Sequence, residues 1–479
     1  MTKELGTVIA TPEGPSTGRF AFVISDQKVR RGEFVQLEGS DGPIFALVQD
    51  ITRGNRYFER PESVREYEQN GSSLLEQFPA AAWDTATANC LVLGTWQNNA
   101  LARSAYPPAP GTKVKEANEE MLKPFLGFRE DGLHVGKLMN HDVPVKLGLS
   151  ALLQKHVAIL AMSGAGKSHL ANVLLEELLD RKKEHGRMAI VALDIHGEYS
   201  GLGDSKINPT YAPKVKVIDA EEITIATREL LRMPELLSET SPVAMRELQK
   251  LLEKLREEKK SFDLEELYEA ANAADINKNV KDPLLDTIGQ LQKLQIFSKV
   301  DNPEIRKSVK SGQALIIDFS KITDLKTKQV IASYFGKKLF SLRQKHEIPP
   351  FLLLVEEAHN FAPEKMSKEN AISKGIIEKI AREGRKFGAN ICLVSQRPVN
   401  LSTTALSQCN TFFILRIMNP NDLDQIRQSA EGIDARTLEQ ISGLKVGEGI
   451  LLGEAVQAPV FVRVRARNSR PGNKATSLE

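Results

Sequence analysis

Hydrophobic residues follow two different patterns along the chain, and the change falls near residue 150. Before that point, short runs of β-forming residues recur between turn residues, which predicts strands joined by hairpins. The runs are Thr7 to Ala10, Phe20 to Ile24, Phe34 to Leu37, Ile44 to Ile51 and Leu91 to Trp96. Short strands connected in this way favour a small β-barrel, which we predict over residues 1–150.

From Val157 onward, continuous apolar runs alternate with segments of helical periodicity. Such runs are typical of parallel strands covered by helices on both faces, so we predict an α/β fold with a parallel sheet. The runs are Val157–Leu160, Met188–Leu193, Val215–Ile218, Ala314–Ile317, Phe351–Val355, Ile391–Val394 and Phe412–Ile417. Ligands of such sheets bind beyond the carboxyl ends of the strands. The polar residues that follow these runs are therefore the candidates for function.

Residues 220–310 interrupt this alternation. They are rich in Glu, Lys, Leu and Ala with helical periodicity, as in Met245 to Lys259 and Pro283 to Leu294, and we predict a helical bundle inserted into the core. The charged run 254–260 is typical of a solvated helix face. The core then comprises residues 151–219 and 311–458. Residues 459–479 form a C-terminal segment, which we expect to be loosely ordered from Arg467 onward.

The segment after the first apolar run of the core, Ala161–Ser168, reads Ala-Met-Ser-Gly-Ala-Gly-Lys-Ser. This is a P-loop pattern, with Ala161 where glycine is usual. In such a loop backbone N–H groups turn onto the β-phosphate of a nucleotide, the lysine reaches the β- and γ-phosphates, and the serine hydroxyl binds Mg²⁺. A helix must follow, so that its positive end faces the phosphates. The predicted nucleotide contacts are Ser163, Gly164, Ala165, Gly166, Lys167, Ser168 and His169.

Two acids follow the apolar run Phe351–Val355. Glu356 and Glu357 have the Walker-B arrangement, in which the first acid supports Mg²⁺ and the second polarises the attacking water. Glu356 stands where aspartate is usual. Adjacent carboxylates at a buried strand end repel each other without a cation, and the alternative is that both begin a surface helix. For His359, contact with the nucleotide and a packing role are equally open.

Two further strand ends carry polar residues. Gln396 follows Ile391–Val394, where a glutamine senses the γ-phosphate or orients water, or else forms a turn. Asp194 follows Met188–Leu193 and either joins the Mg²⁺ shell or caps a turn.

A pair of arginines follows a helix that has a single apolar stripe. The stripe consists of Ile372, Ile376, Ile377 and Ile380. Arg382 and Arg385 project from the other side. In a monomer they form a solvated basic face, whereas in a ring such an arginine reaches the neighbouring nucleotide and stabilises charge at its γ-phosphate.

Composition changes this picture little. The chain has 64 basic and 62 acidic residues, so a DNA-binding surface would be a local patch or a pore lining. The chain has three cysteines, Cys90, Cys392 and Cys409, and their spacing is not that of metal ligands. So few cysteines without a paired pattern are typical of a protein in the reducing cytosol. No apolar stretch reaches ~18 residues, and the start of the chain does not read as a signal peptide. We therefore expect a cytoplasmic protein without membrane contact.

Together these motifs resemble the HerA family, hexameric DNA translocases of archaea and some bacteria within the HerA–FtsK superfamily. The segments that carry the resemblance are Ala161–Ser168, Asp194–Tyr199, Leu354–Phe361, Ile380–Gly388 and Val394–Pro398. It covers nearly the whole chain, since the barrel is similar to the HAS-barrel of the family and the helical insertion lies where the family has one. The resemblance implies a RecA-like P-loop core assembled as a homo-hexamer, with ATP at the subunit interfaces and double-stranded DNA in the pore.

The resemblance also implies roles by position within one subunit. Lys167 and Ser168 would bind phosphate and Mg²⁺, and Glu356 would assist the metal. Glu357 would be the catalytic base and Gln396 the sensor.

Other roles implied by the resemblance lie between subunits or beside the nucleotide. Arg385 would be the finger that acts on the neighbouring subunit, with Arg382 beside it at the interface. A basic residue before the P-loop strand contacts nucleotide in the family, and here that position is Lys155, which lacks the bidentate fork of arginine. Val460–Val464 would brace an adjacent subunit.

The family partner is the NurA nuclease, and together the two resect DNA ends for recombinational repair; some bacterial relatives serve defence effectors instead. This sequence shows no nuclease constellation, so resection would require a separate nuclease. Lys365, Lys368 and Lys374 are candidates for pore contacts to DNA phosphates, which would be strongly salt-dependent.

Alternative functions remain for a P-loop protein of this kind. A GTPase switch requires an Asn-Lys-x-Asp guanine reader, and the nearest segment, Asn277–Val280, lacks the acid. A secretion or conjugation ATPase shares the core motifs, although the barrel favours the ring translocase. A non-catalytic scaffold, in which nucleotide stabilises a ring that assembles an effector, is the third alternative.

Overall fold

A computed structural model describes residues 3–12, 14–25, 28–69, 80–98, 100–237, 241–367, 370–430, 433 and 435–472. The chain divides into two compact units. The first comprises Met1–Gly132, Gly136–Leu147 and Val456–Arg463, and the second comprises Leu133–Val135, Gly148–Ala455 and Val464–Glu479. Residues 456–463 thus group with the amino-terminal unit, although the sequence pattern assigned them to the core and the C-terminal segment.

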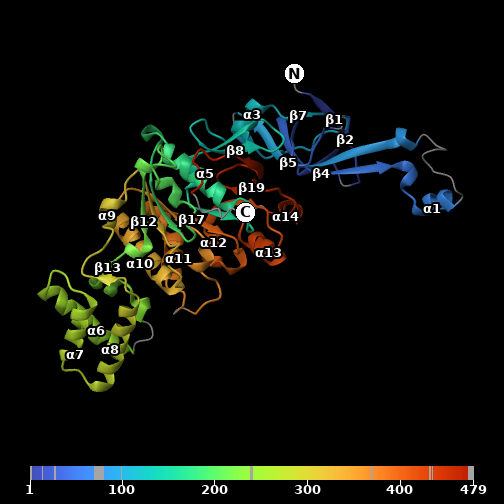
Figure 1. Ribbon diagram of the computed structural model, residues 1–479. Coiled ribbons are helices and arrows are strands. Elements are labelled where there is room, and N and C mark those ends of the chain that lie inside the picture. The colour runs from blue at the N-terminus through green and yellow to red at the C-terminus, as the bar shows by residue number, and fades with distance from the viewer. Residues whose placement is uncertain are drawn as a thin grey trace. The chain divides into compact units, whose positions relative to one another are not determined.

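The first unit contains the predicted β-barrel. Its strands are hydrogen-bonded in the order β2 (Arg19–Ile24), β1 (Glu4–Ile9), β7 (Lys113–Glu116), β3 (Phe34–Gly39), β4 (Gly42–Asn55) and β5 (Asp84–Gln97). Antiparallel pairing of β2 with β5 closes the barrel, whose buried core includes Phe22, Val35 and Val114. The long strands β4 and β5 continue as a two-stranded ribbon as far as the pair Asn55 and Asp84 (Figure 1).

Shorter elements complete the first unit. They are α1 (Pro61–Gln69), β6 (Ala100–Ala102), α3 (Glu119–Phe125) and β9 (Pro144–Leu147). The chain passes between the two units within β8 (Leu133–Leu138) and again within β20 (Val460–Val464). No described helix combines the length and the apolar character that crossing a bilayer requires.

The second unit is built on the predicted parallel sheet. The strand order is β12 (Val215–Asp219), β15 (Ala314–Asp318), β11 (Ala189–Asp194), β16 (Phe351–Val355), β17 (Ala389–Ser395), β10 (His156–Leu160), β18 (Cys409–Leu415) and β19 (Glu448–Gly453). Every pair is parallel except β18 with β19. The central strands β10, β11, β16 and β17 are buried at every position, because helices cover both faces of such a sheet. The P-loop strand β10 lies between β17 and β18, so the polar ends of these three strands lie side by side.

Helices connect the strands and supply the rest of the core. They are α4 (Leu149–Leu152), α5 (Lys167–Asp180), α9 (Ile305–Ser308), α10 (Leu325–Gln344), α11 (Lys374–Glu383), α12 (Thr403–Ser407), α13 (Pro420–Ser429) and α14 (Ala435–Ser442). Of the predicted stripe, Ile376, Ile377 and Ile380 are buried on α11, whereas Ile372 is buried just before the helix begins.

The predicted insertion is a bundle of α6 (Pro242–Glu258), α7 (Leu264–Ala273) and α8 (Lys278–Lys293), which pack against one another (Figure 1). On α6, Leu248, Leu252 and Leu255 recur at spacings of four and three residues and are buried, as a helix with one apolar face requires. Asp263 and Glu266 form a reciprocal capping box that begins α7. The strands β13 (Ile225–Ala226) and β14 (Phe297–Ser298) pair where the chain enters and leaves the bundle.

Candidate nucleotide-binding site

The P-loop residues 161–166 connect β10 to α5, as the sequence predicts. Ala165 N–H donates to the Met162 carbonyl at 3.2 Å, which closes the turn. Gly166 precedes α5 with a φ of 102°, a left-handed conformation that a side chain disfavours. Ser163 and Gly164 are exposed at the tip of the loop. Because α5 begins at Lys167, its first N–H groups and its positive end face this loop, an arrangement suited to binding phosphate.

Lys167 and Glu357 form a buried ion pair next to the P-loop. Lys167 Nζ donates to Glu357 Oε1 at 2.8 Å and lies 4.0 Å from Glu356 Oε1. Glu357 has φ 44° and ψ 50°, a strained backbone for a residue other than glycine, and such strain is concentrated at functional sites. The structure therefore brings the predicted phosphate-binding lysine and the predicted base into direct contact.

Glu356 ends β16 and is completely buried. Its Oε2 accepts hydrogen bonds from Ile195 N–H at 3.0 Å and His196 N–H at 3.4 Å. Burial, and then the negative charge of Asp194, raise the pKa of Glu356 well above its usual value. A cation near Glu356 would remove this penalty, because an opposite charge favours the ionised form.

Asp194, at the end of β11, is used by the turn that follows it. Its Oδ1 accepts from Glu198 N–H at 3.0 Å, and its Oδ2 accepts from Tyr199 N–H at 2.9 Å and from the Ser200 hydroxyl at 3.3 Å. Burial raises the pKa of Asp194, and these backbone hydrogen bonds offset part of the rise. The turn-capping alternative thus describes what this carboxylate does in the structure.

Glu198 is a residue of this site that the sequence reasoning did not single out. Its carboxylate lies close to Glu356 and to the Ser168 hydroxyl. Burial acts to raise the pKa of Glu198, but these two neighbours and the positive charge of Lys167 outweigh burial, so the pKa lies below its usual value. The signal was available, because Glu198 lies on the turn beyond an apolar strand, but Asp194 stood closer to the strand end.

Gln396 follows β17, directly beside the start of the P-loop. Ser395 pairs with Leu160 in register, and its carbonyl accepts from Ala161 N–H at 3.2 Å. His359 Nδ1 lies 3.1 Å from Ser395 Oγ and 3.4 Å from Glu357 Oε2. The structure therefore connects His359 with both strand ends that we selected.

Arg382 and Arg385 lie at the end of α11 and in the turn after it, and both are exposed. A side chain at Gly384 would place its Cβ 2.1 Å from the Ala389 carbonyl, so only glycine allows this tight turn. Arg382 lies 3.8 Å from Glu378 on its own helix. In the described part of the chain, neither guanidinium has an ion pair or hydrogen bond with a P-loop residue.

Two predicted nucleotide contacts lie away from this group. Lys155 precedes β10, at the end of the strand opposite the P-loop. The five residues of β10, at ~3.3 Å per residue, separate it from the P-loop by about 16 Å. The structure thus places Lys155 outside the phosphate site of its own chain. His169 points toward the C-terminal segment, where its Nε2 lies 2.8 Å from the Arg465 carbonyl.

Arg416 is a second residue that the sequence reasoning missed. It follows β18, and its carbonyl accepts from Met162 N–H at 2.9 Å, so it lies beside the P-loop. Its Nε is buried and has no hydrogen-bond partner among the described residues. A polar residue directly after an apolar strand was the same signal that selected Gln396.

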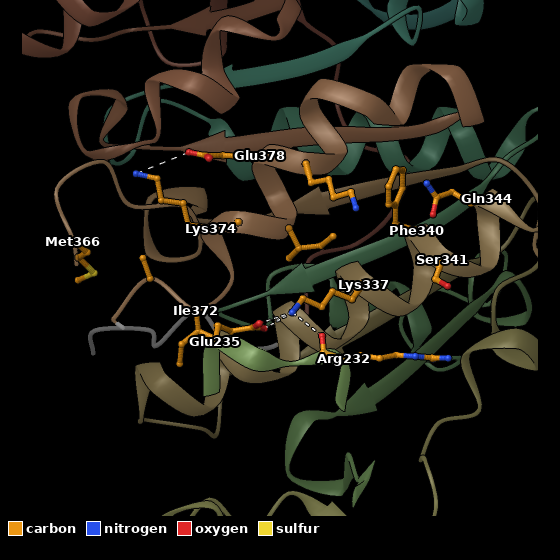
Figure 2. A pocket seen from close by; sticks show the side chains of 14 residues that line it. Arg232, Glu235, Lys337, Phe340, Ser341, Gln344, Met366, Ile372, Lys374 and Glu378 are labelled. Carbon is orange, nitrogen blue, oxygen red and sulfur yellow. Dashed lines mark hydrogen bonds and ion pairs between the residues drawn. The ribbon is translucent and has the colours of Figure 1, made fainter. Parts of the chain in front are cut away.

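A pocket of about 830 Å³ lies on α10 and α11, and Figure 2 shows the ion pair between Glu235 and Lys337 on its wall. Its lining shares no residue with the P-loop or the Walker-B pair. Of the lysines predicted to contact DNA, Lys374 lines this pocket, Lys365 is exposed, and Lys368 lies outside the described residues.

The residues present fit a nucleotide with Mg²⁺, although the protein alone supplies only part of the coordination. Within the described ranges, no group of three or more His, Cys, Asp or Glu side chains is arranged to hold a metal by itself. Mg²⁺ at phosphate sites takes few protein ligands and completes its shell with phosphate oxygens and water. The Ser168 hydroxyl near the Glu198 carboxylate, and the buried Glu356 Oε1, which has no hydrogen-bond partner among the described residues, match that chemistry.

Comparisons with known proteins agree with this architecture. Residues 133–339 match the family model for the central domain of the helicase HerA, and residues 6–84 match the HAS barrel domain. The DNA double-strand break repair helicase HerA of Saccharolobus solfataricus is 27% identical, with 94% of this chain and 91% of the relative covered. Its counterpart in Pyrococcus furiosus is 27% identical, with 90% and 87% covered. The solved structure of VirB4 from Thermoanaerobacter pseudethanolicus has a TM-score of 0.56 at 15% identity and covers 71% of this chain and 97% of VirB4.

The fold and the site together define a P-loop ATPase with a parallel α/β core and an amino-terminal β-barrel. The chain is similar to HerA proteins over nine-tenths of its length, and it contains segments that match the models for the HerA central domain and the HAS barrel. The predicted resemblance is confirmed. The likeness to VirB4 shows that the two proteins share a fold.

Proposed function

We propose that this chain is the subunit of a homo-hexameric ring that moves double-stranded DNA by hydrolysing ATP. The names of its HerA relatives, which are DNA double-strand break repair helicases, support action on DNA. The observation that carries the proposal is that Arg385 is exposed, on a turn that Gly384 fixes, and among the described residues makes no hydrogen bond or ion pair with its own P-loop. In a ring, a neighbouring P-loop is the target such an arginine requires.

Within one subunit, Lys167 binds the β- and γ-phosphates after leaving Glu357. Glu357 then accepts the proton of the attacking water, and Gln396 senses the γ-phosphate. Ser168 and Glu356 would hold Mg²⁺, which neutralises charge between the β- and γ-phosphates when bound. Asp194 orders the turn that presents Glu198 to Ser168, so we assign it a supporting role at the metal.

Complementation between subunits tests the motor. We would measure ATP hydrolysis with and without linear duplex DNA for wild type, Arg385→Ala, Glu357→Gln and a mixture of the two variants. Lys386→Ala is the matched control, because Lys386 is an exposed cation on the same turn. Each single variant should lose roughly 10³-fold in rate. Random mixing should restore about one quarter of the interfaces, since an intact base then meets an intact finger across a head-to-tail contact.

The outcomes separate the alternatives. DNA stimulation together with complementation supports the motor. Hydrolysis that ignores every DNA end favours a protein-transport ATPase, and ring assembly that survives Glu357→Gln with partner function intact favours the scaffold. A mixture that forms mixed rings without regaining activity refutes an arginine acting between subunits. Six chains of 53.1 kDa should give a particle of about 319 kDa by light scattering.

We propose further that the ring acts in DNA end resection for recombinational repair, with a separate NurA-like nuclease. The support is that residues 6–84 match the HAS barrel domain and that the alignment with the double-strand break repair helicase HerA of Saccharolobus solfataricus covers 94% of this chain. A linear duplex should shorten only when the ring, the nuclease and ATP are all present, and Lys167→Ala should abolish shortening. Shortening by the nuclease alone at the same rate would contradict this pairing.

A further inference from the structure

His359 stands between the catalytic carboxylate and the strand end that carries Gln396. Its Nδ1 lies 3.4 Å from Glu357 Oε2 and 3.1 Å from Ser395 Oγ. Ser395 is fully buried, and its Oγ also accepts from Arg397 N–H at 3.1 Å. A continuous path of polar contacts therefore runs from Glu357 through His359 and Ser395 to the backbone on both sides of Gln396.

The proton on this ring can be located from its neighbours. Burial lowers the pKa of His359, so the ring is neutral at pH 7; the charged groups that face it are Glu357, Lys167, Arg397 and Asp422. A neutral imidazole has one N–H and one acceptor nitrogen. Because a bare acceptor would repel the Glu357 carboxylate at this distance, the proton belongs on Nδ1. In this structure Nδ1–H therefore donates to Ser395 Oγ at 3.1 Å and faces Glu357 Oε2 at 3.4 Å.

Lys167 determines when this donor matters. In the structure Lys167 binds Glu357 Oε1, whereas Glu357 Oε2 is buried, without a hydrogen bond in the described part of the chain, and faces His359. Once Lys167 turns to the phosphates, the carboxylate loses its strongest contact. The other polar side chain that faces this carboxylate is His359, 3.4 Å from Glu357 Oε2.

We propose that His359 is a positioning residue that holds the Glu357 carboxylate through Nδ1 after Lys167 has moved to the nucleotide. Ser395 completes the arrangement, because it fixes the imidazole and ties it to the strand end that senses the γ-phosphate. This inference rests on the proposed role of Glu357 as the base. It predicts a loss in the chemical step with little change in nucleotide binding.

Two substitutions distinguish positioning from packing. His359→Leu keeps most of the side-chain volume and removes the donor. His359→Asn keeps an amide N–H close to the position of Nδ1 and loses volume. If His359 acts only through packing, the leucine variant should hydrolyse ATP faster than the asparagine variant. If its N–H donor matters, the asparagine variant should be the faster one.

We would measure kcat and KM for ATP hydrolysis, the Kd of a non-hydrolysable ATP analogue, and the unfolding temperature. The variants are His359→Leu, His359→Asn, Ser395→Ala, the double variant His359→Leu with Ser395→Ala, and Glu357→Gln. His359→Leu should lose roughly 10- to 100-fold in kcat, the scale of a misplaced catalytic group, with Kd within about threefold of wild type. His359→Asn should recover most of that loss. The double variant should be no slower than His359→Leu, because both residues act on one path.

Several results would overturn the inference. They are a His359→Leu rate within twofold of wild type, an equal loss in kcat and nucleotide affinity, an asparagine variant as slow as leucine, or additive losses in the double variant. If His359→Leu lowers the unfolding temperature, His359→Asn and Ser395→Ala decide the question. Glu357→Gln tests the role of Glu357 independently of His359, because full activity in that variant would refute Glu357 as the base.

Discussion

The C-terminal segment is fastened to the P-loop helix by one buried carboxylate, Glu176, and removing that carboxylate should release the segment. Glu176 lies on α5 and is fully buried. It accepts from Arg465 Nη1 at 2.9 Å, from Asn468 N–H at 3.0 Å, and from both the N–H and the hydroxyl of Ser469. The perturbation is Glu176→Ala, with Glu184→Gln as the matched control, because Glu184 is an exposed carboxylate soon after the same helix.

The size of the effect follows from what is left behind. Hydrogen bonds to a charged group contribute about 1.5–3 kcal/mol each, but they do not add. The relevant loss is that of one partner of a buried ion pair, about 3–5 kcal/mol, because Arg465 would stay largely buried with only Glu177 as an ionic partner. At 1.36 kcal/mol per power of ten, hydrogen-exchange protection should fall by roughly two to four powers of ten.

Hydrogen–deuterium exchange of peptides from residues 464–472 measures this release directly. Unchanged protection in Glu176→Ala would refute the reasoning, as would equal loss in Glu184→Gln. Acid should act in the same direction. Burial acts to raise the pKa of Glu176, but the Ser469, Asn468 and Arg465 hydrogen bonds outweigh it, so the folded-state pKa lies below the usual value. The stabilisation is therefore present above the usual glutamate pKa and is lost as the pH falls through the lowered one.

Three further predictions follow from buried groups. Leu252→Ala in the helical bundle should cost about 2–5 kcal/mol in urea unfolding of the bundle, because Leu252 is fully buried; a smaller cost than for an exposed position would contradict the bundle core. Burial lowers the pKa of His156 to about 4, so stability should fall by roughly 3 kcal/mol between pH 6.5 and 4. His156→Gln should remove most of this pH dependence of stability. An unchanged pH dependence in that variant would show that other groups cause it. Burial raises the pKa of the Cys392 thiol to about 12, and Cys90 and Cys409 are also buried, so a thiol reagent at pH 8 should label none of them until the protein unfolds.

Local patterns predicted much of this molecule. The P-loop, the Walker-B pair and the parallel strands are each contiguous in sequence. The rule that ligands bind beyond the carboxyl ends of parallel strands selected Lys167, Glu357 and Gln396 as candidates, and the structure places Lys167 against Glu357. The predictions of the strands and of the loop are confirmed because each depends on how buried and exposed positions alternate over a few neighbouring residues. The barrel and the helical insertion were recognisable for the same reason.

One expectation about order was wrong for residues 467–472, and residues 473–479 lie outside the described part of the chain. We expected residues from Arg467 onward to be loosely ordered, because the sequence there is polar and lacks periodicity. In the structure Ser469 is buried, and Asn208 accepts from Arg470 N–H at 2.7 Å. The part of the segment up to residue 472 is held by partners more than 250 residues away in sequence, and no local pattern contains that information.

What the sequence by itself determined is therefore where the P-loop and the strand ends lie, and on which kind of element each candidate residue lies. Only the tertiary structure decided how they are used: that Lys167 contacts Glu357, that Asp194 is occupied by its own turn while Glu198 reaches Ser168, and that the C-terminal segment binds α5. The physical reason is that alternation and helical period record burial, which is local, whereas side-chain partners depend on the order of strands and the path of loops, which distant packing sets.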